Sequence, residues 1–175
     1  RAFEAGTGVG GTWYWNRYPG ARCDVESLEY SYSFDEDLQQ EWEWTERYSS
    51  QPEILAYANH VADRFSLRES IQFETRVEAA KFDEDDNVWS VRTSDGQTTV
   101  CRFFVMATGC LSSTSLPTFD GIEDFGGTTV HTGQWPKEGV VLKGKRVGVV
   151  GTGSSAVQAI PVIAEECDEL IVFQR

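Results

Sequence analysis

The fold is decided by a stretch near the end of the chain, which reads Val147-Gly148-Val149-Val150-Gly151-Thr152-Gly153-Ser154-Ser155-Ala156. Its apolar first part is typical of a strand, and the pattern Gly-x-Gly-x-x-Ala follows that strand directly. The first glycine of the pattern permits a tight turn, and the second lets the backbone approach a pyrophosphate at the N-terminus of a helix. The stretch therefore predicts a strand, a phosphate-binding turn and a helix.

The residues around this stretch predict a βαβ unit, with strands over 146–150 and 170–173 and a helix over 154–164. Because Pro161 lacks a backbone N–H, we expect a kink or an early loss of regularity in the helix. Arg175 stands at the end of the second strand, where a guanidinium suits the 2′-phosphate of NADPH. An ordinary surface arginine is the alternative interpretation of that residue.

A second glycine pattern, Gly6-x-Gly8-x-x-Gly11, fits the same motif letter for letter after a short strand. Residues 12–20 follow it with bulky aromatics and a turn proline in place of a helix, so we do not interpret it as a phosphate site. Glu4 precedes the pattern, and an acidic side chain at a strand end can bind the ribose hydroxyls of an adenosine. A solvated carboxylate at the end of a strand is the alternative.

The middle of the chain predicts loops, one helix and a sheet. Residues 6–33 are rich in glycine and aromatics, which indicates long packed loops. Pro52 opens an amphipathic helix that continues to about Phe65. Alternating patterns over 71–82, 88–93 and 98–107 then predict three strands joined by turns, which together make an antiparallel meander.

The composition excludes several classes of partner. The 15 Lys and Arg against 28 Asp and Glu give a net charge of −13, which disfavours nucleic acid and anionic membrane surfaces. No apolar run is long enough for a spanning helix, and the chain does not open with a signal-peptide pattern. The four scattered cysteines lack C-x-x-C spacing, so we expect free thiols, no metal site and a cytoplasmic location.

A longer motif lies just before the βαβ unit and reads Phe125-x-Gly127-x-x-x-His131-x-x-x-Trp135-Pro136. It resembles the fingerprint of type I Baeyer–Villiger monooxygenases, and residues 10–24, 30–34, 41–48 and 51–53 also resemble that family, especially the phenylacetone, steroid and cyclohexanone type. The resemblance covers the whole chain. It implies an α/β fold with two Rossmann-like nucleotide-binding domains, both incomplete, and with the meander inserted in the FAD domain.

The resemblance also implies a domain division. Residues 1–118 would be part of the FAD-binding domain, without its first strand and phosphate loop, and residues 119–175 the linker and the start of the NADPH-binding domain. The chain would then be an internal fragment, inactive alone and poorly stable because a sheet edge and apolar surface are open.

The family's cofactor-binding positions carry over onto residues of this chain. On the FAD side, Glu4 would bind the ribose, Val77 would contact the adenine through its backbone, and the remaining positions would face flavin or nicotinamide: Thr12, Trp13, Arg22, Cys23, Asp24 and Tyr30. On the NADPH side the implied residues are Thr152, Gly153, Ser154, Ser155, Ala156, Val157, Gln158 and Arg175.

The chemistry implied by the resemblance uses FAD, NADPH and O2. NADPH reduces FAD, oxygen adds to give a peroxyflavin, and this attacks a small-molecule ketone to form an ester or lactone. Asp24 would orient a catalytic arginine that this sequence does not contain. From the residues alone, a loop-fixing carboxylate is the alternative role of Asp24.

Two further readings stay open. One is a flavin monooxygenase that oxidises nitrogen or sulfur, which the Phe125–Trp135 spacing counts against, and the other is a non-catalytic nucleotide-binding module. His131 has no paired carboxylate or cysteine in the motif, so we interpret it as a hinge or hydrogen-bond anchor rather than a general base. Thr114 stands where many members of the family have proline, and Cys110 occupies a position that varies among them. These two residues leave the substrate preference open.

Overall fold

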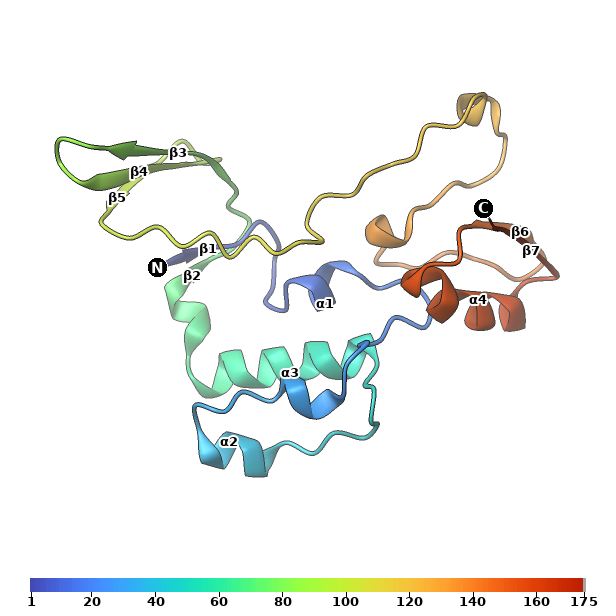
Figure 1. The fold of residues 1–175 in the computed structure, drawn as a ribbon, viewed down its shortest axis with the longest axis horizontal. Coiled ribbons are helices and arrows are strands. Elements are labelled where there is room, and N and C mark those ends of the chain that lie inside the picture. The colour runs from blue at the N-terminus through green and yellow to red at the C-terminus, as the bar shows by residue number, and fades with distance from the viewer. Residues whose placement is uncertain (175) are drawn as a thin grey trace. The chain divides into compact units, whose positions relative to one another are not determined.

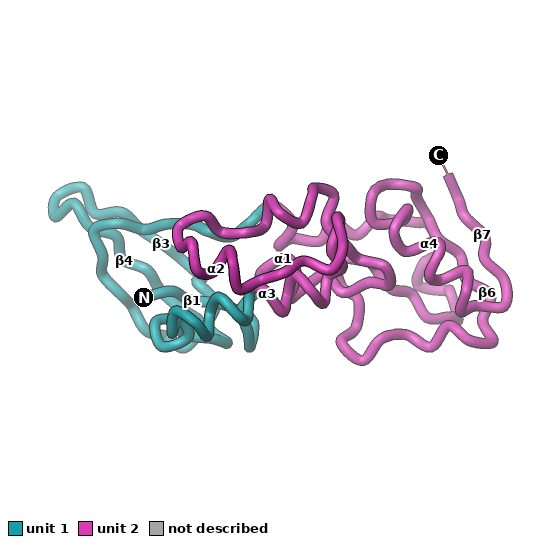
Figure 2. Tube along the Cα trace, turned by 90° about the horizontal axis from the view of Figure 1, so that it is seen from below, with its two compact units in different colours: residues 1–10, 58–109 teal, residues 11–57, 110–175 magenta. Residues whose placement is uncertain are grey.

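The computed structural model describes residues 1–174 as a mixed α/β fold (Figure 1). The chain forms two compact units (Figure 2). The first holds Arg1–Gly10 and Ala58–Gly109, and the second holds Gly11–Tyr57 and the chain from Cys110 onward. The expected functional boundary between residues 118 and 119 is a separate division and stays a prediction.

In the first unit, the predicted strand over 71–82 is wrong, because two separate strands replace it. Strand β1 (Ala2–Phe3) pairs in parallel with β2 (Ile71–Gln72), and β3 begins only at Val77. Between them Glu74 adopts a left-handed φ of 53°, which breaks the extended backbone. The N–H of Thr75 then donates to the carbonyl oxygen of Glu4 at 2.9 Å, so this segment crosses the end of β1.

The antiparallel meander is present and consists of β3 (Val77–Asp83), β4 (Val88–Thr93) and β5 (Thr98–Cys101) in that spatial order. Asn87 and Gly96, both with positive φ, form the two turns. The predicted extension of the last strand to residue 107 is wrong, since no described strand pairs with residues 102–107. Phe103 and Val105 are accordingly more than four-fifths exposed, at 87% and 82%.

The helices before the meander follow from local signals. The predicted helix is confirmed as α3 (Gln51–Arg64), with Pro52 in its first turn. Helix α2 (Glu36–Glu41) begins where the Asp35 carboxylate accepts the Leu38 N–H at 2.8 Å. Gly11 is followed by a single helical turn, α1 (Thr12–Trp15), so the expectation of no helix there is wrong in detail. Short 3-10 turns lie at Ser27–Tyr30 (η1), Leu67–Ser70 (η2), Ile122–Asp124 (η3) and Thr132–Gln134 (η4).

The βαβ unit is confirmed as β6 (Arg146–Val150), α4 (Ser154–Glu166) and β7 (Glu169–Phe173), with β6 and β7 parallel (Figure 1). Leu142, Ala159 and Ile163 form its buried core. The expected early loss of regularity at Pro161 is wrong, since α4 continues to Glu166. A proline removes only one N–H donor, and packing of Ala159 and Ile163 on either side of it holds the helix.

No helix in the described part of the chain combines the length and apolar character needed to cross a membrane. Within residues 1–174 there is also no group of three or more His, Cys, Asp or Glu side chains arranged to hold a metal ion.

Candidate functional site

The glycine turn at the end of β6 is open and uncapped. Gly151 has a φ of 103°, which favours glycine, and its N–H donates to the Phe173 carbonyl oxygen at 2.8 Å. Gly153 is the N-cap of α4, and no described side chain caps that helix. A Cβ built on Gly151 or Gly153 meets nothing within 4 Å. Free N–H groups, the helix dipole and open space together suit a phosphate.

The side chains after this turn differ in exposure. Thr152, Ser154 and Val157 are exposed, whereas Ser155 and Ala156 are half-buried against the rest of the unit. Two hydroxyl groups therefore lie at the open end of α4. Arg175 lies outside the described residues, so its expected contact with a 2′-phosphate stays a prediction.

Gln158, in the second turn of α4, contacts the loop over residues 18–24. Its Nε2 donates to the carbonyl oxygen of Arg22 at 3.1 Å and to Asp24 Oδ1 at 2.9 Å. Its Oε1 accepts from the Tyr18 hydroxyl at 2.8 Å and from the backbone N–H of Arg22 at 3.2 Å. The structure thus brings a residue expected on the NADPH side together with two expected on the FAD side.

The loop around Cys23 is held by backbone contacts. Cys23 is buried, and its N–H donates to the Ser49 carbonyl oxygen at 3.1 Å. Its neighbours Arg22 and Asp24 are exposed, as alternation along an extended segment requires. Arg22 pairs with Glu46 at 3.2 Å, an exposed ion pair that contributes little stability. Arg22 and Asp24 therefore present their side chains to solvent from a fixed backbone.

The aromatic pair expected to line a flavin is assembled within the second unit. The rings of Trp13 and Tyr30 meet edge to face, with centroids 5.6 Å apart. The Gln51 side chain donates to the Trp13 carbonyl oxygen, which ties α1 to the start of α3. Burial raises the pKa of Tyr30, and the nearby Cys23 and Asp24 raise it further while the Trp13 contact lowers it. Tyr30 is therefore a neutral phenol at physiological pH. Thr12, beside Trp13, is exposed.

Glu4 and Val77 lie in the first unit. The Glu4 carboxylate accepts the Gly6 N–H at 2.7 Å, so it faces the glycine loop that follows β1. Its carbonyl oxygen binds the Thr75 N–H, just before Val77 begins β3. The backbone therefore brings these two expected adenosine contacts into one neighbourhood.

The motif over residues 125–135 is mostly exposed and ends in a buried anchor. Phe125 is 61% exposed, and a Cβ on Gly127 would lie 2.7 Å from its ring. His131 Nδ1 accepts the Gly133 N–H at 3.1 Å and so caps η4, a role of a hydrogen-bond anchor. Trp135 is buried, and beyond it Lys137 donates to the Tyr14 hydroxyl at 2.8 Å.

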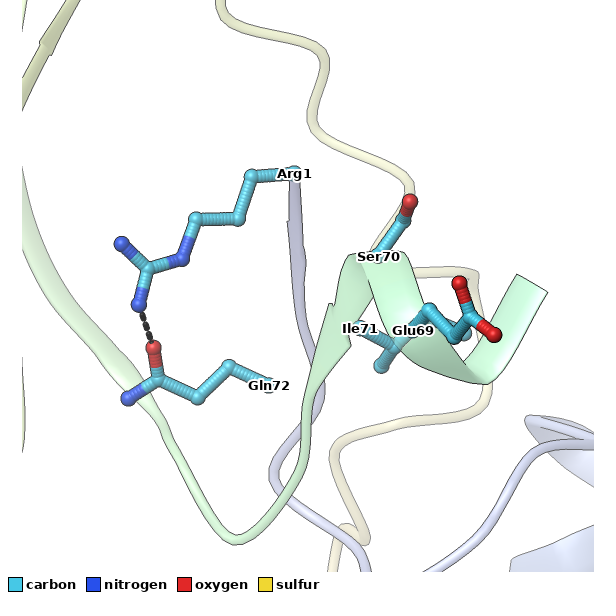
Figure 3. Close-up of a pocket in the computed structure, with 5 residues that line it drawn as sticks. All are labelled: Arg1, Glu69, Ser70, Ile71 and Gln72. Atoms are coloured by element: carbon cyan, nitrogen blue, oxygen red, sulfur yellow. Dashed lines mark hydrogen bonds between the residues drawn. The ribbon is translucent and has the colours of Figure 1, made fainter. Parts of the chain in front are cut away.

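A separate hollow of about 450 Å³ lies in the first unit (Figure 3). Arg1, Glu69, Ser70, Ile71 and Gln72 line it, and the Arg1 guanidinium donates to the Gln72 side-chain oxygen. None of the expected site residues contributes to it.

A model of the flavin-binding monooxygenase-like family matches residues 28–175. The chain belongs to the flavin-binding monooxygenase-like family. Members similar to it include an acetone monooxygenase (methyl acetate-forming) of Gordonia sp. (strain TY-5), 50% identical over 175 residues. A phenazine N-monooxygenase of Lysobacter antibioticus is 48% identical over 175 residues. The matches cover all of this chain but only 33% and 32% of these relatives, so the chain spans about a third of their length.

Solved structures of the family share the fold. A steroid monooxygenase bound to NADP is 60% identical with a TM-score of 0.94, covering 100% of this chain and 34% of that one. The enzyme OTEMO in complex with FAD and NADP is 48% identical with a TM-score of 0.91, covering 99% of this chain and 34% of that one. The mixed α/β fold is therefore that of flavin monooxygenases.

Sequence reasoning missed the contacts that hold this family member's site together. Tyr18 and Lys137 were not among the expected residues, although they bind Gln158 and Tyr14. Both contacts join residues more than 120 positions apart in the chain, 140 and 123 respectively. No local spacing signals such a partner.

Proposed function

We propose that the protein is a Baeyer–Villiger monooxygenase, which uses FAD, NADPH and O2 to convert a small-molecule ketone into an ester or lactone. The observation that carries this proposal is the 50% identity over 175 residues to an acetone monooxygenase. Other relatives of similar identity are named for cyclohexanone and cyclopentanone, which are also ketones.

The residues fit the two cofactors. The open turn over residues 151–155 has the free N–H groups and the space that a dinucleotide phosphate needs. The aromatic rings of Trp13 and Tyr30 would pack against a flavin, and the Glu4 carboxylate would accept hydrogen bonds from a ribose. Arg175 would read the 2′-phosphate that distinguishes NADPH from NADH. When bound, FAD and NADPH would supply the hydride transfer and the oxygen activation.

The roles of the chain's own residues are to bind, orient and exclude water. Asp24 accepts one hydrogen bond at Oδ1, and within residues 1–174 its Oδ2 has no hydrogen-bond partner. That free oxygen suits a guanidinium, so we assign Asp24 the role of orienting a catalytic arginine in the complete protein. Buried Cys23 and Trp135 would fix the backbone beside the cofactors.

The finer architecture belongs to the same proposal. Residues 1–118 would serve the FAD-binding domain, with β3–β5 as its inserted meander, and the chain from 119 onward would link to and begin the NADPH-binding domain. The parallel β6–α4–β7 unit supports the second assignment, because its turn has the geometry of a nucleotide-binding crossover.

Oxidation of a ring nitrogen is a second candidate, favoured by the 48% identical phenazine N-monooxygenase. The two activities share both cofactors and differ in the atom that receives oxygen. Residues outside the cofactor positions would therefore decide between them.

The deciding experiment measures stoichiometry. The complete protein, reconstituted with FAD, is given NADPH and a panel of linear, cyclic and aromatic ketones together with phenazines. We expect ester or lactone in proportion to NADPH consumed. Oxidation of NADPH to hydrogen peroxide alone on every ketone would overturn the proposal, and N-oxide as the main product would establish the second candidate.

A further inference from the structure

We infer that Gln158 is a positioning residue that fixes Asp24 from the nucleotide-binding helix. What Asp24 then does for catalysis rests on the proposed function, whereas the positioning itself does not. Gln158 lies on α4, whose N-terminal turn would bind the cofactor phosphates, and its side chain reaches the loop that carries Arg22 and Asp24.

The side-chain amide of Gln158 is fully used. An amide offers two N–H donors and two acceptor lone pairs, and all four are occupied by Tyr18, Arg22 and Asp24 at 2.8 to 3.2 Å. No natural side chain other than asparagine has this set of donors and acceptors. Asparagine is one methylene shorter and cannot reach every partner from the same backbone position.

The loop also rests directly on the backbone of α4. A Cβ on Gly20 would lie 2.3 Å from the Gln158 carbonyl oxygen, so the two backbones approach as closely as a glycine allows. Tyr18 packs against the core of Leu142, Ala159 and Ile163. The loop over residues 18–24 therefore packs directly on α4 and its core, and the hydrogen bonds of the Gln158 amide fix the position of the loop along the helix.

The filled amide argues against a direct role in holding a nucleotide. Both Nε2 hydrogens point at protein oxygens, one of them a carboxylate, and a charge-assisted bond of this kind is costly to exchange. A change at Gln158 should thus act through Asp24 rather than through a lost contact with the cofactor. This distinction can be measured.

The test uses the complete protein and three variants. Gln158→Glu keeps the shape of the side chain but removes both donors and places a second carboxylate beside Asp24. Gln158→Leu removes all four bonds. Gln40→Leu, on the exposed face of α2, is the matched control. Asp24→Asn is combined with Gln158→Leu to complete a double-mutant cycle.

Two readouts are needed. Hydrogen–deuterium exchange over residues 18–24 should rise in both Gln158 variants and stay unchanged in Gln40→Leu. The turnover number for oxygenated product should fall about tenfold to a hundredfold, as expected for a lost bond to a charged group, with the KM for NADPH changing much less. In the Asp24→Asn background, Gln158→Leu should lower the turnover number only slightly further.

The outcomes separate the two claims. Unchanged exchange over 18–24, or a loss confined to the KM for NADPH, or additive effects with Asp24→Asn would each overturn the positioning role. If the wild-type protein forms no oxygenated product, the proposed function fails, and the exchange data alone decide whether Gln158 holds the loop. If Gln158→Leu does not fold, the isosteric Gln158→Glu gives both readouts.

Discussion

Gln158 Nε2 lies 2.9 Å from Asp24 Oδ1, although 134 positions separate the two residues in the chain. Asp24 is otherwise exposed on a loop whose backbone is fixed by buried Cys23. One amide therefore links the helix that follows the glycine turn to the carboxylate that we propose orients a catalytic arginine. The glycine turn proposed to bind phosphate and the Asp24 carboxylate are thereby held within the same compact unit.

The close approach of the loop to helix α4 leaves no room for a side chain at Gly20. Gly20→Ala places a methyl group 2.3 Å from the Gln158 carbonyl oxygen at a φ of 76°, so the loop must shift. We expect a loss of stability of about 1–3 kcal/mol, measured by chemical denaturation. Gly139→Ala is the matched control, because its φ is 78° and its methyl group meets nothing within 4 Å. An equal loss in both variants would mean that φ alone matters.

The open glycine turn predicts a binding defect without a folding defect. Gly153→Ala should leave the melting temperature unchanged, since its methyl group meets no atom within 4 Å and its φ of −73° suits alanine. The methyl group would occupy phosphate space, so we expect NADP⁺ to bind about tenfold more weakly by calorimetry. Gly126→Ala, which also has open space, is the control. Unchanged affinity in Gly153→Ala would argue against a phosphate at this turn.

The Lys137–Tyr14 contact predicts a small, separable contribution to stability. The ammonium donates to the hydroxyl at 2.8 Å and lies 4.9 Å from the ring centroid. Lys137→Met should cost about 0.5–1.5 kcal/mol, and Tyr14→Phe less, because the ring still attracts the ammonium. Thermal unfolding of both variants and the double mutant checks this, with exposed Lys143→Met as control. Strictly additive losses would show that the two side chains do not interact.

The turn at Asp95 predicts an acid-sensitive hairpin. Hydrogen bonds from the Thr93 hydroxyl and the Gln97 N–H hold the pKa of Asp95 below its usual value of 3.8. A lowered folded pKa stabilises the hairpin above the unfolded pKa, and this contribution is lost as the pH falls through the folded value. The hairpin of Asp95→Asn should therefore be less stable than that of the wild type at pH 6, and the difference in stability should be smaller at pH 3.

The control for the hairpin is Asp86→Asn, which changes an exposed aspartate in the β3–β4 turn at the other end of β4. Hydrogen exchange of β4 and β5 at the two pH values measures the local effect. A difference between Asp95→Asn and wild type that is independent of pH would show that the carboxylate's charge is not responsible.

Several elements could be predicted because their causes are local. The β6–α4–β7 unit follows from apolar periodicity and the glycine turn, and α3 follows from apolar periodicity and Pro52. Each signal lies within or beside the element that it predicts. The predictions that failed had non-local causes. Pairing of Ile71–Gln72 with β1 split one expected strand, and β5 ended at Cys101 because no strand in residues 1–174 pairs with the residues that follow it.

The candidate site divides in the same way. The sequence by itself predicted the glycine turn with its strand and helix, the aromatic and acidic cofactor-binding positions, and the family, because each is written in short spacings of residue types. Only the tertiary structure decided that Gln158 binds Tyr18, Arg22 and Asp24, and that Lys137 binds Tyr14. The partners of Gln158 are set by the packing of Tyr18 on the Leu142, Ala159 and Ile163 core and by the close contact at Gly20. No periodicity along the chain encodes a contact made across more than 120 residues.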